Sequence, residues 1–532
     1  MPNRYIYVIG ALLIAGFSIF FSRSSPPDSG PPRHFPGRNN TVLFLSDSHP
    51  GLANVLVATS HAMLIEYPDI EVHFASFPKL EKSILETSEF ATQQNSAAKP
   101  IEFHPLVGKA YGESLADVGF QMQDAIQPPG LKGISEFCYH MQDFLMPWTA
   151  PDYLAIYQDI LRIIDEIDPL IIAVDPLLGP GLDAIRTRGR NYVILSPNTL
   201  KDNFVSMQPW GTMFWKYPAM SSGHPYPVPW HLIPANIYLN IRFIYSAFNT
   251  PRLAEKKAFL KANGIAKPLD VFTIYHKDYL WLTQAIPEAE FPMPVLPPNL
   301  VTCGSIFRSA APAVEQDPEL TAWLSQAPTV LINLGSSVTY DEYGAMEIVH
   351  AIKTLLANST MQVIWKFNKR GPFSRDIFSE VSTEIDDGRL RLEKWLNIDP
   401  AAMMETGNIA VSVHHGGANC FFEAVAVGIP QIILPLWVDL YDYATRVEYL
   451  GIGIFGSSTS APNWTSHELT TAFMRALDGG QESVRMRENA RVLGELARKA
   501  GGRFRAAKEI SKLARRESKG KEKGLSVEQA VR

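Results

Sequence analysis

Short apolar runs separated by segments with helical spacing set the pattern along this chain. The first run, residues 41–45, is followed by residues 52–65, whose apolar positions recur at helical spacing. Three further runs, residues 71–75, 170–174 and 192–195, have the length and apolar content of buried strands. Strands that alternate with helices in this way predict parallel β-α-β units.

A second alternating set begins after a proline-rich interruption. Its candidate strands are residues 329–333, 362–365, 409–413 and 431–434. The interruption, residues 285–298, contains too many prolines for a helix and reads as an extended connection between domains. The pattern therefore predicts an α/β protein with two doubly wound, Rossmann-like domains that face each other across a cleft, where ligands bind at the carboxyl ends of strands.

These patterns divide the chain into five parts: residues 1–40, an N-terminal segment and Pro/Ser/Gly-rich linker; 41–284, the first domain; 285–328, the interdomain linker; 329–515, the second domain; and 516–532, a basic tail. Thr465 and Glu468 have the spacing of a capping box that opens a helix. Residues 512–523 carry six basic and two acidic side chains, so we expect a solvated, mobile end there.

Residues 5–21 form an uncharged apolar stretch and predict an N-terminal hydrophobic helix. At ~1.5 Å per residue they approach the short limit for crossing a hydrocarbon core of ~30 Å. A cleaved signal peptide is the alternative, but the residues that follow lack a clear small-x-small cleavage site, so we favour a single-pass anchor in the endoplasmic reticulum membrane. Arg23, Arg33 and Arg38 follow the stretch and weakly favour a cytosolic body. Three glycosylation sequons, at Asn39, Asn358 and Asn463, leave a lumenal body open.

Composition narrows the classes of partner. The chain has 532 residues, is 46% hydrophobic and carries a net charge of −6, so nothing in its overall charge points to nucleic acid. The cysteines Cys138, Cys303 and Cys420 are few, odd in number and far apart. They form neither a disulfide framework nor a CxxC metal motif, and we expect no metal.

The chemistry-bearing residues gather between residues 395 and 442. His415, Gly416 and Gly417 follow a predicted strand and should open a helix, whose free N–H groups suit a diphosphate. Asn419 and Cys420 would lie in the first helical turn, and Trp395 upstream offers an aromatic plate. Two carboxylates follow, Glu423 eight residues after His415 and Asp439 near the end. Together these are the parts needed to hold a nucleoside diphosphate with a sugar attached.

This spacing resembles the signature of the UDP-dependent glycosyltransferases, the inverting family of GT-B fold, and is similar to its fungal membrane-anchored members. The resemblance implies that Trp395 stacks on uracil and that Glu423 accepts from the ribose hydroxyls. It further implies phosphate contacts from His415, Gly417, Asn419 and Cys420, with Ser336 and Ser337 on a Gly-Ser turn beside them. Asp439 would hold sugar hydroxyls. The donor, which serves as a substrate and not as a cofactor, would then be a UDP-sugar such as UDP-glucose, bound by the second domain.

The chain departs from that family pattern at several positions. Asn397 and Ile398 replace the Pro-Gln after the tryptophan, Leu440 replaces the last glutamine, and Cys420 replaces a common serine. Leu52 stands in the position that we match to the family's basic histidine, and leucine cannot accept a proton.

A nearby histidine offers a replacement for that base. His49 lies just upstream on the same loop, and Asp175 ends a strand as the family's aspartate does. We therefore assign His49 as the base that deprotonates the acceptor and Asp175 as the residue that orients it.

Residues 200–250, in the predicted acceptor-binding domain, are dense in aromatic side chains. They make either a packed irregular insertion or a pocket wall for an apolar acceptor. We expect metal-independent transfer of a hexose to a hydroxyl of a lipophilic small molecule such as a sterol, lipid or secondary metabolite. A catalytically silent nucleotide-sugar binder that supports a membrane partner is the alternative, based on Leu52. A GT-B epimerase is a third, which the predicted anchor and the aromatic region disfavour.

Overall fold

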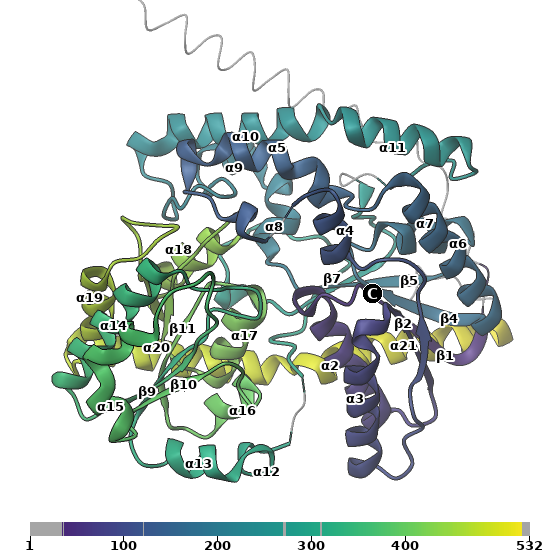
Figure 1. The fold of residues 1–532 in the computed structure, drawn as a ribbon. Helices are drawn as coiled ribbons and strands as arrows, with labels where there is room; N and C mark the ends of the chain where they lie inside the picture. Colours follow the sequence, from purple (N-terminus) through teal and green to yellow (C-terminus); the bar gives the residue numbers. More distant parts are fainter. Residues whose placement is uncertain (1–34, 36, 121, 270–272, 309–310, 524–532) are drawn as a thin grey trace, which may run out of the picture.

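Two parallel β-sheets, each enclosed by helices, make up the protein (Figure 1). The computed structural model describes residues 35, 37–120, 122–269, 273–308 and 311–523. Every strand pair recorded within the two sheets is parallel, as the alternation of strands and helices predicts.

The first sheet has seven strands in the order β3-β2-β1-β4-β5-β6-β7. Their bounds are β1 (Arg38–Leu45), β2 (Glu71–Ser76), β3 (Glu102–Pro105), β4 (Pro169–Val174), β5 (Tyr192–Ser196), β6 (Leu280–Thr283) and β7 (Leu300–Thr302). The helices of this domain are α2 (Pro50–Glu66), α3 (Glu81–Gln94), α4 (Tyr111–Asp117), α5 (Ile134–Leu145), α6 (Ala150–Ile167), α7 (Gly179–Thr187), α8 (Leu200–Phe204), α9 (Thr212–Trp215), α10 (Ile233–Phe248) and α11 (Pro251–Ala262).

The second sheet has six strands in the order β10-β9-β8-β11-β12-β13. They are β8 (Thr329–Ile332), β9 (Gln362–Lys366), β10 (Leu390–Glu393), β11 (Ile409–His414), β12 (Gln431–Ile433) and β13 (Gly453–Phe455). The later helices are α12 (Ala313–Gln316), α13 (Pro318–Leu324), α14 (Glu342–Ala357), α15 (Ser382–Asp386), α16 (Pro400–Glu405), α17 (Ala418–Val427), α18 (Leu440–Leu450), α19 (Ser466–Leu477), α20 (Gln481–Ala500) and α21 (Gly502–Lys523).

All eight strands expected from apolar runs are confirmed, with ends that move by at most three residues. The helix expected at residues 52–65 is α2, and Thr465 caps α19 by accepting the Glu468 N–H. The strands that the pattern missed are β3, β6, β7, β10 and β13. They are three or four residues long, and sequences such as EFHP in β3 or LRLE in β10 mix polar and apolar residues, whereas the equally short β8 and β12 lie in apolar runs.

The proline-rich segment 285–298 contains no α-helix, only the 3-10 turn Pro287–Ala289. Strand β7 follows it and completes the first sheet beside β6, although it lies within residues 285–328, which the sequence assigns to the linker. The chain therefore leaves the first domain only after residue 302.

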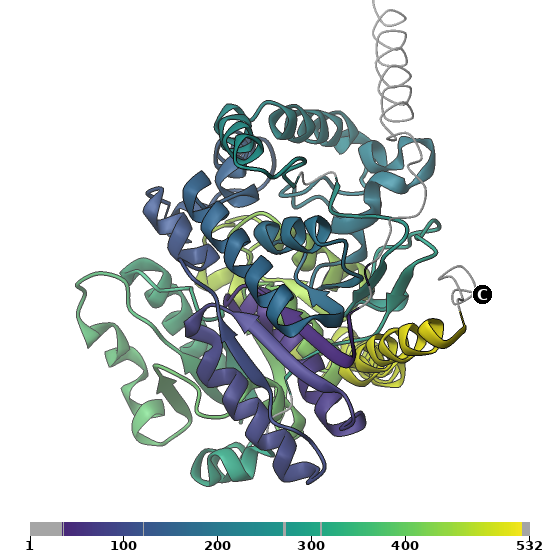
Figure 2. The same ribbon diagram turned by 90° about the vertical axis from the view of Figure 1, so that its right-hand side faces the viewer.

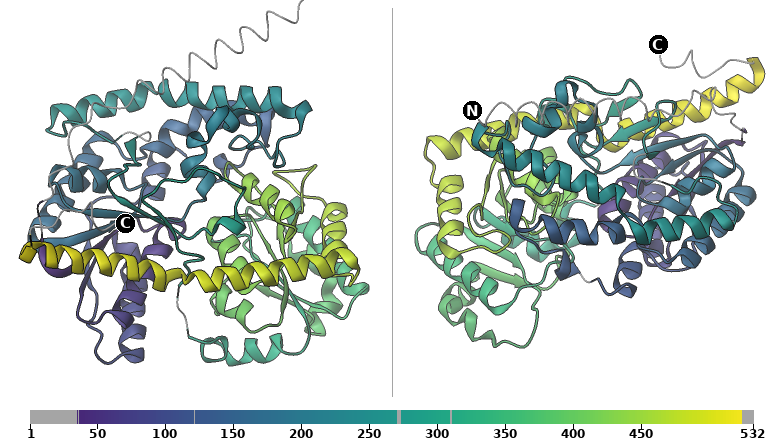
Figure 3. Two further views of the ribbon diagram at one scale, coloured as in Figure 1. Left: turned by 180° about the vertical axis from the view of Figure 1, so that it is seen from behind. Right: turned by 90° about the horizontal axis from the view of Figure 1, so that it is seen from above.

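The last helix returns to the first domain. In α21, Ala506, Ala507, Ile510 and Ala514 are buried against the cluster that contains Val42 of β1. Figure 2 and Figure 3 show this helix running behind the molecule from the second domain to the first. Helix α21 extends to Lys523, and within the part predicted to be a mobile basic end Leu513 and Ala514 still pack against the first domain.

Among the residues that the structure describes, no helix has both the length and the apolar composition of a membrane span. The predicted hydrophobic helix at residues 5–21 lies outside the described residues.

We predict that Ile510→Ala lowers the free energy of unfolding by about 2–5 kcal/mol, because it leaves a cavity between α21 and the first domain. Urea denaturation measures this loss. Lys508→Ala, on the exposed face of the same helix, is the control and should change stability by less than about 0.5 kcal/mol. Equal effects of the two substitutions would mean that α21 does not stabilise the first domain.

Candidate active site at the junction of the two sheets

A tight turn between β11 and α17 forms the centre of the site. Gly416 has a φ of +92°, and a Cβ at this position would lie 2.9 Å from the Ile433 side chain. Gly417 caps the N-terminus of α17. The turn therefore needs glycine, and it leaves the first N–H groups of α17 open to an anion.

His415 is held between two glycines of different loops. A Cβ on Gly335 would lie 2.7 Å from its ring, and a Cβ on Gly417 would lie 2.6 Å from its Nε2. Burial, with smaller contributions from the neighbouring His414 and Lys366, lowers the pKa of His415 to about 3. Its Nδ1 is buried without a hydrogen-bond partner. His415 is therefore a neutral imidazole with one ring nitrogen free for a ligand.

Trp395 is 62% exposed, unlike an ordinary core tryptophan. The Nζ of Lys366, at the end of β9, lies 4.1 Å from the centre of its ring. Lys366 also donates to the Gly335 carbonyl at 3.1 Å, and burial lowers the pKa of this ammonium. An aromatic surface and a partly desolvated cation thus stand next to the α17 N-terminus.

Cys420 and Glu423, one turn apart on α17, line a small cavity with Asn333 and Ser412. Burial raises the pKa of Glu423 well above its usual value, and the charge of Asp399 raises it further. Arg308, from the connection between the domains, opposes that rise. Burial also raises the pKa of Cys420 to about 12, so Cys420 is a neutral thiol.

Two further segments lie close to the turn. Ser336 and Ser337, after β8, are exposed next to Gly335, which has a φ of +91°. Asn419 donates from Nδ2 to the carbonyl of Pro50 in the first domain at 3.1 Å, while its Oδ1 is buried without a partner. The loop after β1 therefore meets the N-terminus of α17, and the carboxyl ends of β1 and β11 meet at one junction.

Charged groups from both domains are buried further along this junction. Lys201 of α8 pairs with Asp442 of α18, and Arg446 Nη1 lies 2.9 Å from Glu290 Oε2, with all four side chains at most 3% exposed. Asp439 lies beside the first pair. Burial raises its pKa to about 7, with Asp202 and Asp442 adding to the rise and Lys201 opposing it. These carboxyls are therefore desolvated and close enough to influence one another.

Hydrogen bonds from the loop at Gln127 to α18 and to the segment before it add to this contact. Tyr441 donates to the Gln127 carbonyl at 2.7 Å, and the Gln127 N–H donates to Leu436 at 3.0 Å. The two domains thus meet through paired polar groups as well as through apolar packing.

The predicted catalytic pair has a different arrangement. His49 caps α2, and its Nδ1 accepts the Gly51 N–H at 3.2 Å. Asp175 is fully buried at the end of β4, where Oδ1 accepts the Leu177 N–H at 2.9 Å and Oδ2 has no partner. The expected hydrogen bond between His49 and Asp175 is not formed, because the imidazole nitrogen that would donate is engaged at the start of α2.

Asp47 connects the two residues. Its Oδ1 accepts the His49 N–H at 2.7 Å, and its backbone N–H and its charge both act on Asp175. Burial raises the pKa of Asp175 to about 7 and that of Asp47 to about 6. Burial and the charge of Lys79 lower the pKa of His49, so the imidazole is neutral at neutral pH.

Several buried polar atoms around the junction lack a hydrogen-bond partner. They include His415 Nδ1, Asn419 Oδ1, Asp175 Oδ2, Asp202 Oδ1 and Asp442 Oδ1. Native proteins leave few such atoms unpaired, and their concentration at one place indicates a site that a polar ligand completes.

Sequence reasoning missed Lys366, Arg308, Asp202 and Asp47. Asp47 and Lys366 could have been found, since each stands at the carboxyl end of a strand. Arg308 and Asp202 carry no such signal, because their place beside the site depends on how the domains meet.

The aromatic region at 200–250 has two parts. Tyr217 and Tyr226 are buried in a cluster with Phe291, as the interpretation as a packed insertion expects. Other members are exposed: Trp210, Trp215, Trp230, Tyr238, Tyr245 and Phe248. These exposed side chains belong to the molecular surface and are not part of the buried cluster.

The chain matches the family model for UDP-glucoronosyl and UDP-glucosyl transferase over residues 235–496. It is 33% identical over 504 residues to the glycosyltransferase sdnJ of Sordaria araneosa, a match that covers 89% of this chain and 98% of that protein. It is 27% identical over 248 residues to the mouse (Mus musculus) 2-hydroxyacylsphingosine 1-beta-galactosyltransferase, a match that covers 46% of this chain and 40% of that protein.

Solved structures of glycosyltransferases share the fold. The kitacinnamycin glycotransferase aligns with a TM-score of 0.58 at 16% identity, over 90% of this chain and 100% of that one. A UDP-glucosyltransferase from Polygonum tinctorium aligns with a TM-score of 0.57 at 16% identity, over 90% of this chain and 99% of that one.

We predict that Gly417→Ala weakens UDP binding by roughly tenfold, the equivalent of one lost hydrogen bond. The new Cβ would lie 2.6 Å from His415 Nε2 and must displace the ring. Isothermal titration with UDP measures the change. Gly112→Ala, where a Cβ meets nothing within 4 Å, is the control and should bind UDP as the unchanged protein does. Unaltered affinity in Gly417→Ala would mean that the ring position does not matter for the donor.

Proposed function

Since the chain belongs to the UDP-glycosyltransferase family and is an enzyme that uses a UDP-sugar, we propose that it transfers a hexose with inversion to a hydroxyl of a lipophilic small molecule. UDP-glucose is the donor that we propose. The observation that carries the proposal is the group of unpaired buried polar atoms where the carboxyl ends of the two sheets meet.

The second domain offers a surface for each part of the donor. Trp395 has the open ring on which a uracil can stack, and Glu423 has the carboxyl group suited to two ribose hydroxyls. The α17 N-terminus and Lys366 supply positive charge for the diphosphate. With that charge in place, we propose that no metal or other cofactor takes part.

Donors of hydrogen bonds surround the proposed diphosphate position. Ser336 and Ser337 are exposed on the loop beside Gly335, and His415 has a free ring nitrogen. Cys420 contributes its backbone N–H, because its neutral thiol is a weak donor. Asp439, beside Lys201 and Asp442, is placed to accept hydrogen bonds from the hexose.

The proposed reaction is a single displacement. The acceptor oxygen attacks the anomeric carbon, His49 takes the hydroxyl proton, and the bond from that carbon to the diphosphate oxygen breaks. The electron pair of that bond leaves with UDP, whose charge the α17 N-terminus and Lys366 stabilise. Asp175 stabilises the imidazolium that forms on His49.

This role requires the His49 ring to turn away from the Gly51 N–H. Its Nδ1–H would then donate to the unpartnered Oδ2 of Asp175, and Nε2 would face the acceptor. Catalytic hydrogen bonds often form only when substrate is bound. The position of Asp47 supports the proposal, since it contacts the backbone of His49 and the carboxylate of Asp175.

We propose that the acceptor is lipophilic and that the protein works at a membrane surface, at the endoplasmic reticulum. On α10, Tyr238, Ile241, Tyr245 and Phe248 follow one helix face and are each at least 40% exposed. Trp230, on the turn before this helix, is 83% exposed. Figure 1 places α10 at one edge of the first domain, and tryptophan and tyrosine are favoured where an apolar phase meets water.

We predict that Glu423→Gln weakens UDP binding by roughly three- to tenfold, because an amide offers one acceptor oxygen in place of the two oxygens of the carboxyl group and one lost hydrogen bond costs about 0.5–1.5 kcal/mol. Titration calorimetry measures the affinity. The control is Glu342→Gln, an exposed glutamate in the first turn of α14. If both variants bind UDP as tightly as the unchanged protein, Glu423 does not hold the ribose.

We predict that His49→Gln and Asp175→Asn each lower kcat by about 10²–10⁴-fold, the usual contribution of a general base, and leave UDP affinity within about threefold. UDP release from UDP-glucose with a hydrophobic alcohol as acceptor measures turnover. His231→Gln, an exposed histidine on the turn before α10, is the control. Loss of UDP binding in the Asp175 variant would assign that residue a structural role instead.

We predict that vesicles of brominated phosphatidylcholine quench the tryptophan fluorescence of the full chain, and that Trp210→Phe combined with Trp230→Phe removes most of this quenching. These side chains are 90% and 83% exposed. Trp323→Phe, at 8% exposure in the second domain, is the control. Quenching that survives the double substitution would argue against this membrane-facing surface.

A further inference from the structure

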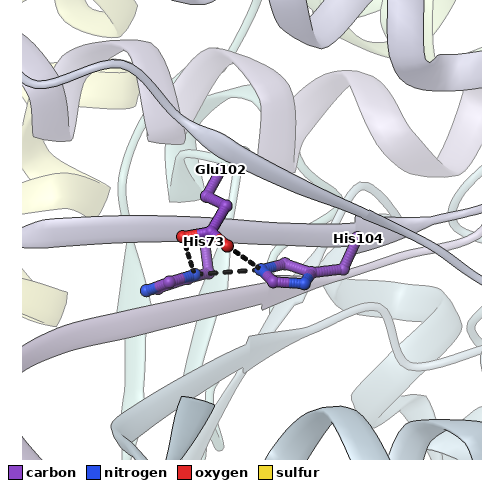
Figure 4. Close-up of side chains that lie close together, drawn as sticks. All are labelled: His73, Glu102 and His104. Atoms are coloured by element: carbon purple, nitrogen blue, oxygen red, sulfur yellow. Dashed lines mark hydrogen bonds and ion pairs between the residues drawn. The ribbon is translucent and has the colours of Figure 1, made fainter. Parts of the chain in front are cut away.

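Two histidines and a glutamate converge on the outer edge of the first sheet (Figure 4). His73 lies on β2, and Glu102 and His104 lie on the edge strand β3. In the strand register His73 is opposite Glu102, and Ala75 is opposite His104. Because side chains two residues apart share a face, all three side chains project from the same side of the sheet.

The ligand atoms lie at distances that suit a tetrahedral metal ion. His73 Nδ1 is 3.0 Å from His104 Nε2 and 3.5 Å from Glu102 Oε2, and His104 Nε2 is 3.9 Å from Glu102 Oε1. Two ligands at ~2.0–2.1 Å from a tetrahedral Zn²⁺ are roughly 3.3 Å apart. The observed spacings lie on both sides of that value.

The two imidazoles are largely enclosed, whereas the glutamate is open to solvent. His73 is 3% exposed, and burial is the largest cause that lowers the pKa of both His73 and His104. Glu102 is 63% exposed, yet its carboxylate turns toward the two rings, so the position between the three side chains opens to solvent.

A second carboxylate is placed to orient His73. Glu71 Oε1 lies 3.5 Å from His73 Nε2, on the side of the ring opposite Glu102. A proton on Nε2 that faces this carboxylate leaves Nδ1 free as a ligand, an arrangement common behind metal-bound histidines. Arg38 Nη2 also lies 3.5 Å from Nε2, but it is closer to Glu71 Oε2, at 3.2 Å.

The remaining charges near the cluster are already paired. From α6, Arg162 and Glu166 both act on His104, and they are joined to each other at 2.7 Å. Arg162 also contacts Asp159 at 2.7 Å. Arg38 is paired with Glu71, so Glu102 is the carboxylate that faces the rings without a basic side chain as its partner among the described residues.

We propose that His73, Glu102 and His104 bind a divalent transition-metal ion, with Zn²⁺ as the expected ion and water as its fourth ligand. Two imidazole nitrogens and one carboxylate oxygen form a donor set that favours Zn²⁺ over Mg²⁺ or Ca²⁺. The ion joins the edge strand β3 to β2, so its role is structural and separate from sugar transfer. The inference does not depend on the proposed function.

Metal binding by the full, untagged chain after dialysis against a chelator tests the proposal. Titration with Zn²⁺ should give one equivalent bound, and Co²⁺ should give the visible absorption of a tetrahedral site. Glu102→Gln and His104→Gln should each lower the Zn²⁺ affinity by at least about a hundredfold. Glu71→Gln should lower it by roughly 10–100-fold, as loss of an orienting carboxylate does.

His350→Gln is the matched control, because His350 also faces a glutamate, Glu380, at 3.3 Å but has no second histidine. Circular dichroism establishes that each variant folds, and the exposed Glu102 makes its substitution the safest. Absence of stoichiometric binding overturns the proposal. So does binding that survives both Glu102→Gln and His104→Gln, or that His350→Gln removes equally.

Discussion

The site depends on glycine at positions 335, 416 and 417, because none of these residues carries a Cβ atom. They allow the His415 ring to lie between two loops and bring the backbone of the β11–α17 turn close to β12 and α18. A methyl group at any of the three positions would meet its neighbours at 2.6–2.9 Å. The same turn presents the helix N-terminus, so one local packing requirement gives the second domain both its histidine position and its anion-binding surface.

The junction between the domains also removes several carboxyl groups from water. Carboxyl groups that would be ionised in water are enclosed there, and burial raises the pKa of Asp175, Asp439 and Glu290 to about 7. Lys201 and Arg446 offset part of this cost through ion pairs that cross between the domains. Such groups are costly to bury without partners, and the unpaired atoms among them are reason to expect a polar ligand. Perturbed carboxyls at a junction of this kind are typical of catalytic sites.

The first domain carries two features that the site does not use. The aromatic face of α10 and the His73–Glu102–His104 cluster lie on separate elements, one on a helix and one on the edge of the sheet. An edge strand of four residues has few hydrogen bonds to hold it, so an ion that ties β3 to β2 would strengthen this edge of the sheet. Helix α21 lies far from the first sheet in the sequence, and it packs the C-terminal part of the chain against the first domain.

The sequence by itself determined the class of fold, the eight strands that lie in apolar runs and the turn at residues 415–417, because apolar runs and glycine requirements involve only a few neighbouring residues. It also pointed to Trp395 and Glu423, which the fold brings to the α17 turn. Only the tertiary structure decided that Lys366 lies over Trp395, that Asp47 stands between His49 and Asp175, and that α21 belongs with the first sheet. These contacts join residues far apart in the chain, or depend on which way a ring turns. They follow from how the elements pack, and no local pattern encodes them.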